Sequence, residues 1–269
     1  MSHRPIITLL TDFGTRDGYT GAVKGVIKSL NPKIDIIDIT HSIESFNIKK
    51  AAFTLLNYYD RFPDDTVHLA VVDPGVGSGR NVIILKSLNH CFVGPDNGLF
   101  QYVTERTEYK IYMVNTDAMY QNQKGYTFHA RDIFAPVAAK LASGADPETL
   151  GSIIENLQTT GSERIPDRSQ LSELRIDVIT QDKFGNIIFD FRKQDLKRQR
   201  HQQIKSIRFK NFESDQIYDY YSQVTKGTPI FLWNSQDFLE LAVNQGSALE
   251  FFNSNPVDKA MIKLEDSHR

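Results

Sequence analysis

The chain has 269 residues, of which 40% are hydrophobic and 11% aromatic, and its formal net charge is −2. This composition supplies enough apolar side chains for one or two folded domains and excludes a largely disordered chain. The charge balance gives no general attraction for nucleic acid, and no apolar run is long enough to cross a bilayer, so we expect a soluble protein with neither partner.

The first residues, MSHRPIITLL, contain a short apolar stretch that continues directly into structured sequence, which is not typical of a secretory signal. The single cysteine, Cys91, excludes an intrachain disulfide and a Cys-rich zinc site, and its apolar neighbours predict a buried thiol. Both features favour a cytoplasmic protein.

Strand and helix patterns alternate in the N-terminal part of the chain. The expected strands are 5–10, 34–39, 67–72, 81–85, 91–93 and 109–114, and the expected helices are 19–30, 48–59 and 132–141. Asp132 could cap the last helix. The initial βαβαβ order predicts an α/β domain over residues 1–160, with a mainly parallel sheet covered by helices.

A polar segment with several Gly and Pro residues follows residue 143, and we place a linker at 161–172. Short β-type runs separated by turns come next, at 175–180, 186–189, 204–209, 229–233 and 238–243. These runs predict a smaller antiparallel β domain over residues 173–269. The basic run Arg192–Arg200 is typical of a solvated helix or hairpin end rather than a nucleic-acid patch.

The first candidate site residue is Asp12, in Thr11-Asp12-Phe13-Gly14 at the carboxyl end of the first expected strand. Open α/β sheets bind ligands at this edge, where a carboxylate can hold a ribose diol. Asp12 could equally shape the turn or cap the following helix, and its position alone leaves both interpretations open.

The second candidate is the glycine-rich segment Val71–Arg80, VVDPGVGSGR. Phosphate-binding glycine loops lead into a helix whose N-terminal amides meet the phosphate, whereas the residues after Arg80 are β-formers. We therefore expect a loop between two strands, with an acid, Asp73, at its start and a base, Arg80, at its end. A plain glycine-rich hairpin would leave both charged residues unexplained.

His129 lies in TFHARD, just before the helix expected from Asp132. A lone histidine is more often structural than catalytic, although its polar neighbours favour a functional role. No HExxH pair or His/Cys cluster indicates a metal site. Two polar segments of the β domain, at 180–186 and 234–242, complete the candidates, and the first is by itself typical of a hairpin turn.

These motifs occur in a consistent order along almost the whole chain. They are TDFG at 11–14, HSI at 41–43, VVDPGVGSGR at 71–80, GPDNGL at 94–99, TFHARDIFAP at 127–136, DKFGN at 182–186 and NSQDFLELA at 234–242. Together they resemble the S-adenosylmethionine (SAM) hydroxide adenosyltransferase family, which is related to the enzymes that make fluoro- or chloro-deoxyadenosine.

The resemblance implies an N-terminal α/β domain, a C-terminal β domain and a homotrimer. Each active site would lie between the N-terminal domain of one subunit and the C-terminal domain of its neighbour. The implied reaction is S-adenosyl-L-methionine plus water giving adenosine plus L-methionine, with no cofactor and no metal.

The resemblance also assigns residues to parts of the substrate. The nucleophile water or hydroxide would be associated with Asp73, Arg80 and His129. The ribose hydroxyls would be held by Asp12, between pocket walls formed by Phe46 and Phe128. The neighbouring subunit would supply Tyr221 to stack on adenine, Asn186 to hydrogen-bond it, and Asp182 and Ser235 to hold the amino-acid end.

Two positions separate hydrolysis from halogenation. The fluorinating relatives place a tyrosine where Asp73 stands and a halide-holding serine where Ala130 stands. An ionised Asp73 would repel a halide in a desolvated pocket, and Ala130 offers no hydroxyl donor, so water is the better-matched nucleophile. Near the methionine carboxylate, Gln236-Asp237 departs from the family pattern of an aromatic or basic residue followed by glycine.

The sequence leaves the proton acceptor open. With ordinary pKa values of about 6.5 for His and about 3.9 for Asp, His129 is the more natural acceptor near neutrality unless burial raises the pKa of Asp73. Three other functions remain as alternatives: a SAM-dependent halogenase, a metal-dependent nucleotidase, and a non-catalytic adenosine or SAM binding module.

Overall fold

The computed structural model describes residues 4–116, 127–157, 172–198 and 202–266. The chain divides into two compact units, residues 1–161 and 162–269. Apart from Ser172, the linker predicted at 161–172 lies outside the described residues, and the exact domain limits stay predictions.

The N-terminal unit contains one sheet, whose strand order is β2-β1-β3-β5-β4-β6-β7. Its strands are β1 (Ile6–Thr11), β2 (Asp35–Thr40), β3 (Val67–Val71), β4 (Val82–Ser87), β5 (Cys91–Pro95), β6 (Tyr109–Val114) and β7 (Gly151–Ile154). Its α-helices are α1 (Tyr19–Leu30), α2 (Ile48–Leu56), α3 (Gln101–Thr104) and α5 (Ala135–Ala142).

This sheet is partly parallel rather than mainly parallel. Strands β2, β1, β3 and β5 pair in parallel, whereas the β5–β4, β4–β6 and β6–β7 pairs are antiparallel. The reason lies in the connection between β4 and β5, which is only Leu88–His90. A parallel crossover needs a dozen or more residues, so these two strands can only form a hairpin.

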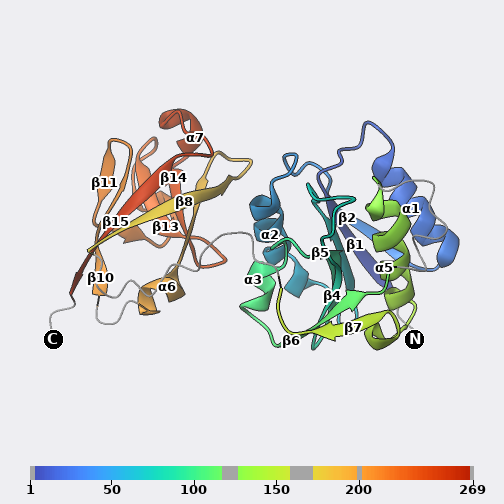
Figure 1. The fold of residues 1–269 in the computed structure, drawn as a ribbon. Coiled ribbons are helices and arrows are strands. Elements are labelled where there is room, and N and C mark those ends of the chain that lie inside the picture. Colours follow the sequence, from blue (N-terminus) through green and yellow to red (C-terminus); the bar gives the residue numbers. More distant parts are fainter. Residues whose placement is uncertain (1–3, 117–126, 158–171, 199–201, 267–269) are drawn as a thin grey trace. The chain divides into compact units, whose positions relative to one another are not determined.

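Helices α1 and α5 lie side by side on one side of the sheet, and α2 and α3 lie on the other (Figure 1). Alternate residues of β1, Ile7 and Leu9, are fully buried and share a core with Val23 and Ile27 of α1. This alternation follows from the period of two along a strand and fixes which face of β1 meets the helices. The core therefore holds the carboxyl ends of β1 and β3 in place.

A π-helical turn, Ala130–Phe134, leads directly into α5. His129 is the residue just before this turn, and its side chain makes no capping hydrogen bond. The predicted capping role of Asp132 is wrong. Asp132 lies inside this turn, where its carboxylate accepts hydrogen bonds from the Arg131 guanidinium at 2.6 and 2.8 Å.

The C-terminal unit is rich in antiparallel pairs, with the strand order β11-β10-β15-β8-β9-β14-β13-β12. The strands are β8 (Glu173–Gln181), β9 (Ile187–Arg192), β10 (Gln202–Phe209), β11 (Phe212–Ser214), β12 (Ile217–Tyr218), β13 (Pro229–Trp233), β14 (Phe238–Val243) and β15 (Lys259–Asp266). Only β12 and β13 pair in parallel among the described strands of this unit. Two short helices, α6 (Lys193–Arg198) and α7 (Ala248–Phe251), accompany them.

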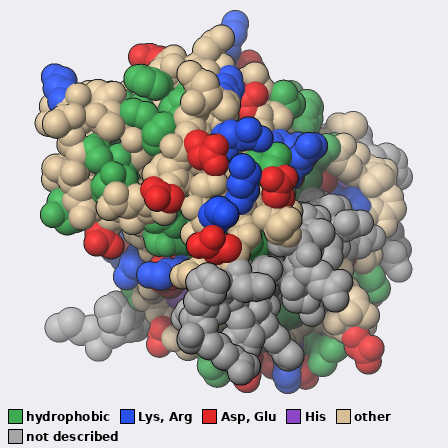
Figure 2. All heavy atoms as spheres, turned by 90° about the vertical axis from the view of Figure 1, so that its left-hand side faces the viewer, with side chains coloured by type: hydrophobic (Ala, Val, Ile, Leu, Met, Phe, Trp, Pro, Cys, Tyr) green, Lys and Arg blue, Asp and Glu red, His purple; other side chains and the backbone are tan. Residues whose placement is uncertain are grey.

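Charged side chains of both signs are mixed on the surface of the C-terminal unit (Figure 2). The ion pair Lys205–Glu265 joins the neighbouring strands β10 and β15 there, and Lys263–Glu213 reaches across β10 from β15 to β11. Arg192 corrects the expectation of a solvated basic run, because it is 7% exposed and lies 3.6 Å from Asp195. In the described part of the chain, no helix is both long and apolar enough to cross a membrane.

Candidate active site

Two candidate carboxylates leave the N-terminal sheet at the same edge. Thr11 at the end of β1 is the register partner of Val71 at the end of β3, and Asp12 and Asp73 follow these strands. The carboxyl ends of neighbouring parallel strands form the ligand-binding edge of such sheets. The sheet thus brings together two residues that are 61 positions apart in the chain.

The loop after β3 connects two strands, as predicted, but it is not a hairpin. It leads to β4, while β5 lies between β3 and β4 in the sheet. Within the loop, Val76 N donates to Asp73 O at 3.2 Å, and Gly77 adopts a positive φ of 79° that few other residues tolerate. This turn returns the chain so that Arg80 faces Asp73.

Asp73, Arg80 and His129 form one buried cluster. Arg80 Nε lies 2.9 Å from both carboxylate oxygens of Asp73, and Arg80 Nη2 also donates to Oδ2 of that carboxylate. Arg80 Nη2 is 2.9 Å from His129 Nδ1. The Arg80 and Asp73 side chains are 7% and 5% exposed, and His129 is 1% exposed. Water is therefore largely excluded from an ion pair whose charges balance.

The cluster defines the protonation state of His129. A guanidinium can only donate hydrogen bonds, so His129 Nδ1 must accept from Arg80, and the proton of the neutral ring is on Nε2. Burial and the Arg80 charge lower the pKa of His129 below its ordinary value, although Asp73 and Asp132 oppose this shift. The ring is neutral at pH 7.

Both ends of the Val71–Arg80 loop are fixed by the GPDNGL segment, to whose residues we had assigned no roles. Asn97 Nδ2 donates to Val72 O at 2.9 Å, just before Asp73. Asp96 N donates to Asn81 O at 3.1 Å, just after Arg80, and Asn81 Nδ2 returns a bond to Asp96 Oδ2 at 3.3 Å. The ends of β5 and β3 therefore hold the loop that presents the acid and the base.

Asp12 connects the end of β1 to the loop that carries Phe46. Asp12 Oδ2 accepts a hydrogen bond from Phe46 N at 2.9 Å. The alternative that Asp12 caps α1 is excluded, because Gly18 is the N-cap residue and no side chain caps that helix. Phe46 has a positive φ of 68° and is 68% exposed, so it is available to contact a ligand.

Phe128, the neighbour of His129 in sequence, packs beside the same strand end. Its ring makes edge-to-face contacts with Phe13 and Tyr19, at centroid distances of 6.0 and 5.2 Å. Our sequence reasoning missed these two aromatic residues, although Phe13 directly follows Asp12. The N-terminal unit therefore brings together Asp12, Phe128 and the residues around them at one edge.

In the C-terminal unit, Asp182 builds the turn between β8 and β9. Its Oδ1 accepts from Phe184 N and Asn186 N, and its Oδ2 accepts from Asn186 Nδ2, all at 2.9 Å. Gly185 has φ 82°, and a Cβ there would lie 2.1 Å from Ser247 Oγ. The hairpin interpretation is thus confirmed, and it also places Asp182 and Asn186 in direct contact.

Tyr221 contacts a buried acid that we did not single out from the sequence. Glu240, 4% exposed in β14, accepts a hydrogen bond from Tyr221 Oη at 2.8 Å and another from the Asn234 side chain. Burial and the nearby Asp182 charge raise the pKa of Glu240, while the bonds from Tyr221 and Asn234 oppose this. Ser235 is exposed at the β13–β14 turn. An acidic residue inside the apolar run FLELAV was the available signal.

No three His, Cys, Asp or Glu side chains in the described ranges form a group that could hold a metal ion. The N-terminal cluster of Asp73, Arg80 and His129 can align a small nucleophile in a desolvated site. The C-terminal cluster offers the aromatic face of Tyr221, the amide of Asn186 and the carboxylates of Asp182 and Glu240. Groups of these kinds are suited to bind a purine nucleoside and an amino acid.

Comparison with known proteins agrees with this arrangement. Residues 7–151 match the SAM hydroxide adenosyltransferase N-terminal domain, and residues 176–261 match the C-terminal domain of that family. The structure is similar to that of an uncharacterized conserved protein from Thermotoga maritima, with TM-score 0.80 and 33% identity, covering 96% of this chain and 99% of the other.

The similar curated proteins carry two names. The (R)-S-adenosyl-L-methionine hydrolase of Methanocaldococcus jannaschii is 35% identical, over 96% of this chain and 95% of its own. The protein of that name from Thermus thermophilus is 31% identical, over 92% and 94%. The Fluorinase of Nocardia brasiliensis is 23% identical over 72% of this chain and 74% of its own. The chain belongs to the SAM hydroxide adenosyltransferase family.

Proposed function

We propose that the protein hydrolyses S-adenosyl-L-methionine to adenosine and L-methionine, by attack of water or hydroxide at the ribose 5′ carbon. The observation that carries this proposal is the buried Asp73–Arg80–His129 cluster at the sheet edge that also bears Asp12. The leaving group is a neutral thioether expelled from a sulfonium, so no general acid is needed. The enzyme has to align and deprotonate one water molecule.

The hydrogen bonds within the cluster favour Asp73 over His129 as the proton acceptor. His129 Nδ1 already accepts from Arg80, and its Nε2 carries a proton. Asp73 Oδ2 accepts from both Nε and Nη2 of Arg80, whereas Oδ1 accepts only from Nε and keeps a further lone pair. Arg80 Nη1 is buried and makes no hydrogen bond within the described part of the chain, so it can stabilise developing hydroxide.

Substrate recognition is divided between the two units in this proposal. Asp12 holds the ribose hydroxyls between Phe46 and Phe128. In the C-terminal unit, Tyr221 stacks on adenine, and Asn186 hydrogen-bonds it. The amino-acid end is held by Asp182 and Ser235. We propose that the protein is a cytoplasmic homotrimer that uses no cofactor, with each site completed by the C-terminal unit of a neighbouring subunit.

Ala130 supports water rather than halide as the nucleophile. It directly follows His129, is 3% exposed and has no hydroxyl to donate to a halide ion. The Asp73 carboxylate would also repel a halide at close range. The chloride and fluoride arms of the following assay test this distinction.

The decisive experiment incubates the purified protein with SAM in H₂¹⁸O and separates the products by chromatography with mass detection. Attack at the 5′ carbon places ¹⁸O in the 5′-hydroxyl of adenosine and leaves L-methionine unlabelled. The (R) and (S) sulfonium epimers are assayed separately, because the relatives are named for the (R) form.

Three further arms of this assay address the alternatives. Halogenated deoxyadenosine formed in fluoride or chloride would indicate a halogenase. Loss of activity with a chelator would favour the metal-dependent nucleotidase. Adenosine binding without any labelled product would reduce the protein to a binding module and would overturn the proposed hydrolysis.

A further inference from the structure

His41 holds the strand end that carries Asp12, and the proposed mechanism does not use it. It lies directly after β2 and is 7% exposed. Its ring Nδ1 is 2.9 Å from Thr11 Oγ1, and its carbonyl oxygen accepts from Gly14 N at 2.7 Å. Asp12 lies between Thr11 and Gly14 in the chain, so His41 fixes the backbone on both sides of this residue.

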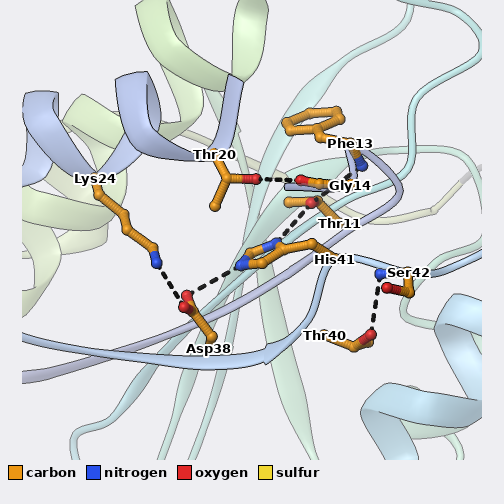
Figure 3. A network of polar contacts seen from close by, with 9 residues as sticks. All are labelled: Thr11, Phe13, Gly14, Thr20, Lys24, Asp38, Thr40, His41 and Ser42. Carbon is orange, nitrogen blue, oxygen red and sulfur yellow. Dashed lines mark hydrogen bonds and ion pairs between the residues drawn. The ribbon is translucent and has the colours of Figure 1, made fainter. Parts of the chain in front are cut away.

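The directions of the hydrogen bonds follow from the neighbouring groups. His41 Nε2 lies 3.0 Å from Asp38 Oδ1, and in the neutral ring that carries its proton on Nε2, Nδ1 accepts from the Thr11 hydroxyl. Thr11 Oγ1 in turn accepts from Phe13 N at 3.3 Å. Although burial opposes the shift, hydrogen bonds from Lys24 and His41 lower the pKa of Asp38. A continuous chain of polar contacts thus runs from the Asp38 carboxylate to the turn that carries Asp12 (Figure 3).

The same histidine begins the loop that leads to Phe46. Asp12 Oδ2 accepts from Phe46 N, and Phe46 adopts a positive φ of 68°, which is unfavourable for a residue with a Cβ. Such a conformation persists only where surrounding contacts hold it. Movement of the Asp12 turn would therefore also release Phe46.

We propose that His41 is a positioning residue for ribose recognition, which acts through the Thr11 hydroxyl to fix Asp12 and Phe46 in their binding positions. This inference rests on the proposed function, because it requires that Asp12 bind the ribose diol. It assigns a role to the HSI segment, and it separates His41, which orders the substrate site, from His129, which belongs to the nucleophile cluster.

The test compares Thr11→Val, His41→Gln and His41→Asn. The asparagine amide lies near the position of Nδ1 and can still accept from Thr11, whereas the glutamine amide reaches toward Asp38 and leaves Thr11 without its acceptor. By calorimetry, Thr11→Val and His41→Gln should raise the Kd for adenosine about five- to tenfold, the loss expected for one buried hydrogen bond. His41→Asn should retain most of the affinity, and kcat at saturating SAM should stay within about twofold for all three, because the lost bond affects only binding.

Thr8→Val is a matched control on the same strand. Thr8 is fully buried in β1, and its Oγ1 makes the same kind of bond, to His68 Nδ1 at 2.8 Å. It lies three residues before Thr11, inside the strand and away from its carboxyl end. Thr8→Val should lower the Tm to a similar extent and leave the Kd for adenosine unchanged. An equal loss of affinity in both variants would overturn the proposal, because general destabilisation would then explain the effect.

Asp12→Ala separates failure of this inference from failure of the proposed function. If Asp12→Ala leaves adenosine affinity unchanged, the ribose assignment and the positioning role both fall. If Asp12→Ala weakens binding while Thr11→Val and His41→Gln do not, only the positioning role is overturned. The proposal is supported if Thr11→Val causes no further loss of affinity in the Asp12→Ala background.

Discussion

The polar clusters of the two units differ in how their buried charges are compensated. In the N-terminal cluster, Asp73 and Arg80 neutralise each other in a site that is almost closed to water. In the C-terminal cluster, the side-chain donors to the buried Glu240 within the described ranges are the neutral groups of Tyr221 and Asn234. In the proposed function, the first arrangement stabilises a reacting group, and the second fixes a surface that recognises a ligand. Substitutions in the two clusters should therefore change different kinetic constants.

The largest effect is expected for Arg80→Met. This change removes the donor to both Asp73 and His129, so we expect kcat to fall by about 10²–10³-fold, the range found when a donor to a developing oxyanion is lost. The Kd for adenosine should change by less than about threefold, since Arg80 acts on the nucleophile. Product chromatography and calorimetry measure the two quantities.

A single removal leaves Asp73 as an uncompensated buried charge, which by itself is destabilising. The matched control is therefore the double variant Asp73→Asn with Arg80→Met, which removes both charges. It should fold at least as well as Arg80→Met and be equally inactive. Turnover close to that of the native protein in this double variant would contradict the assignment of the cluster.

Much of the fold was predictable because it depends on local pattern. Helix α1 was predicted with its observed limits, Tyr19–Leu30, since Val23, Ile27 and their neighbours recur at helical spacing. The direction of β4 was not predicted. It depends on the length of the β4–β5 connection and on which strand lies beside β3, and these are properties of the whole sheet.

The candidate site was predictable where a motif carries both of its chemical groups. Asp73 and Arg80 are within ten residues of each other, and the structure pairs them. The partners of Tyr221 and Thr11 were not predictable in the same way. Glu240 and His41 reach them through strand pairing, and each is a single polar residue in an otherwise ordinary apolar or turn sequence.

Tyr221 tests the recognition side of the comparison. Tyr221→Ala should raise the Kd for adenosine about tenfold or more, because stacking of a base on an aromatic ring contributes about 1–3 kcal/mol. Tyr221→Phe keeps the ring but removes the donor to Glu240, and about a fivefold loss is expected for one hydrogen bond. Calorimetry gives both values, and kcat at saturating SAM should change little. A fall in kcat with unchanged affinity would place Tyr221 with the reacting groups and remove the distinction between the clusters.

The smallest effect concerns stability and its dependence on pH. Because the pKa of Glu240 is raised in the folded state, its contribution to folding stability is fully present below its ordinary value and is lost as pH rises through the folded value. At neutral pH, burial of the charge therefore costs stability, and Glu240→Gln should raise the Tm by about 2 °C or more. The difference in Tm should shrink toward zero as the pH falls to about 4, near the ordinary pKa of a glutamate. Thermal unfolding of both proteins from pH 4 to pH 8 measures this window. Glu250→Gln, in the short helix α7, is the control that should show no such dependence, since Glu250 is exposed to solvent. A constant difference in Tm across the range would show that Glu240 is ionised as easily as a surface acid. Burial would then not disfavour the Glu240 charge, and this contrast between the two clusters would be lost.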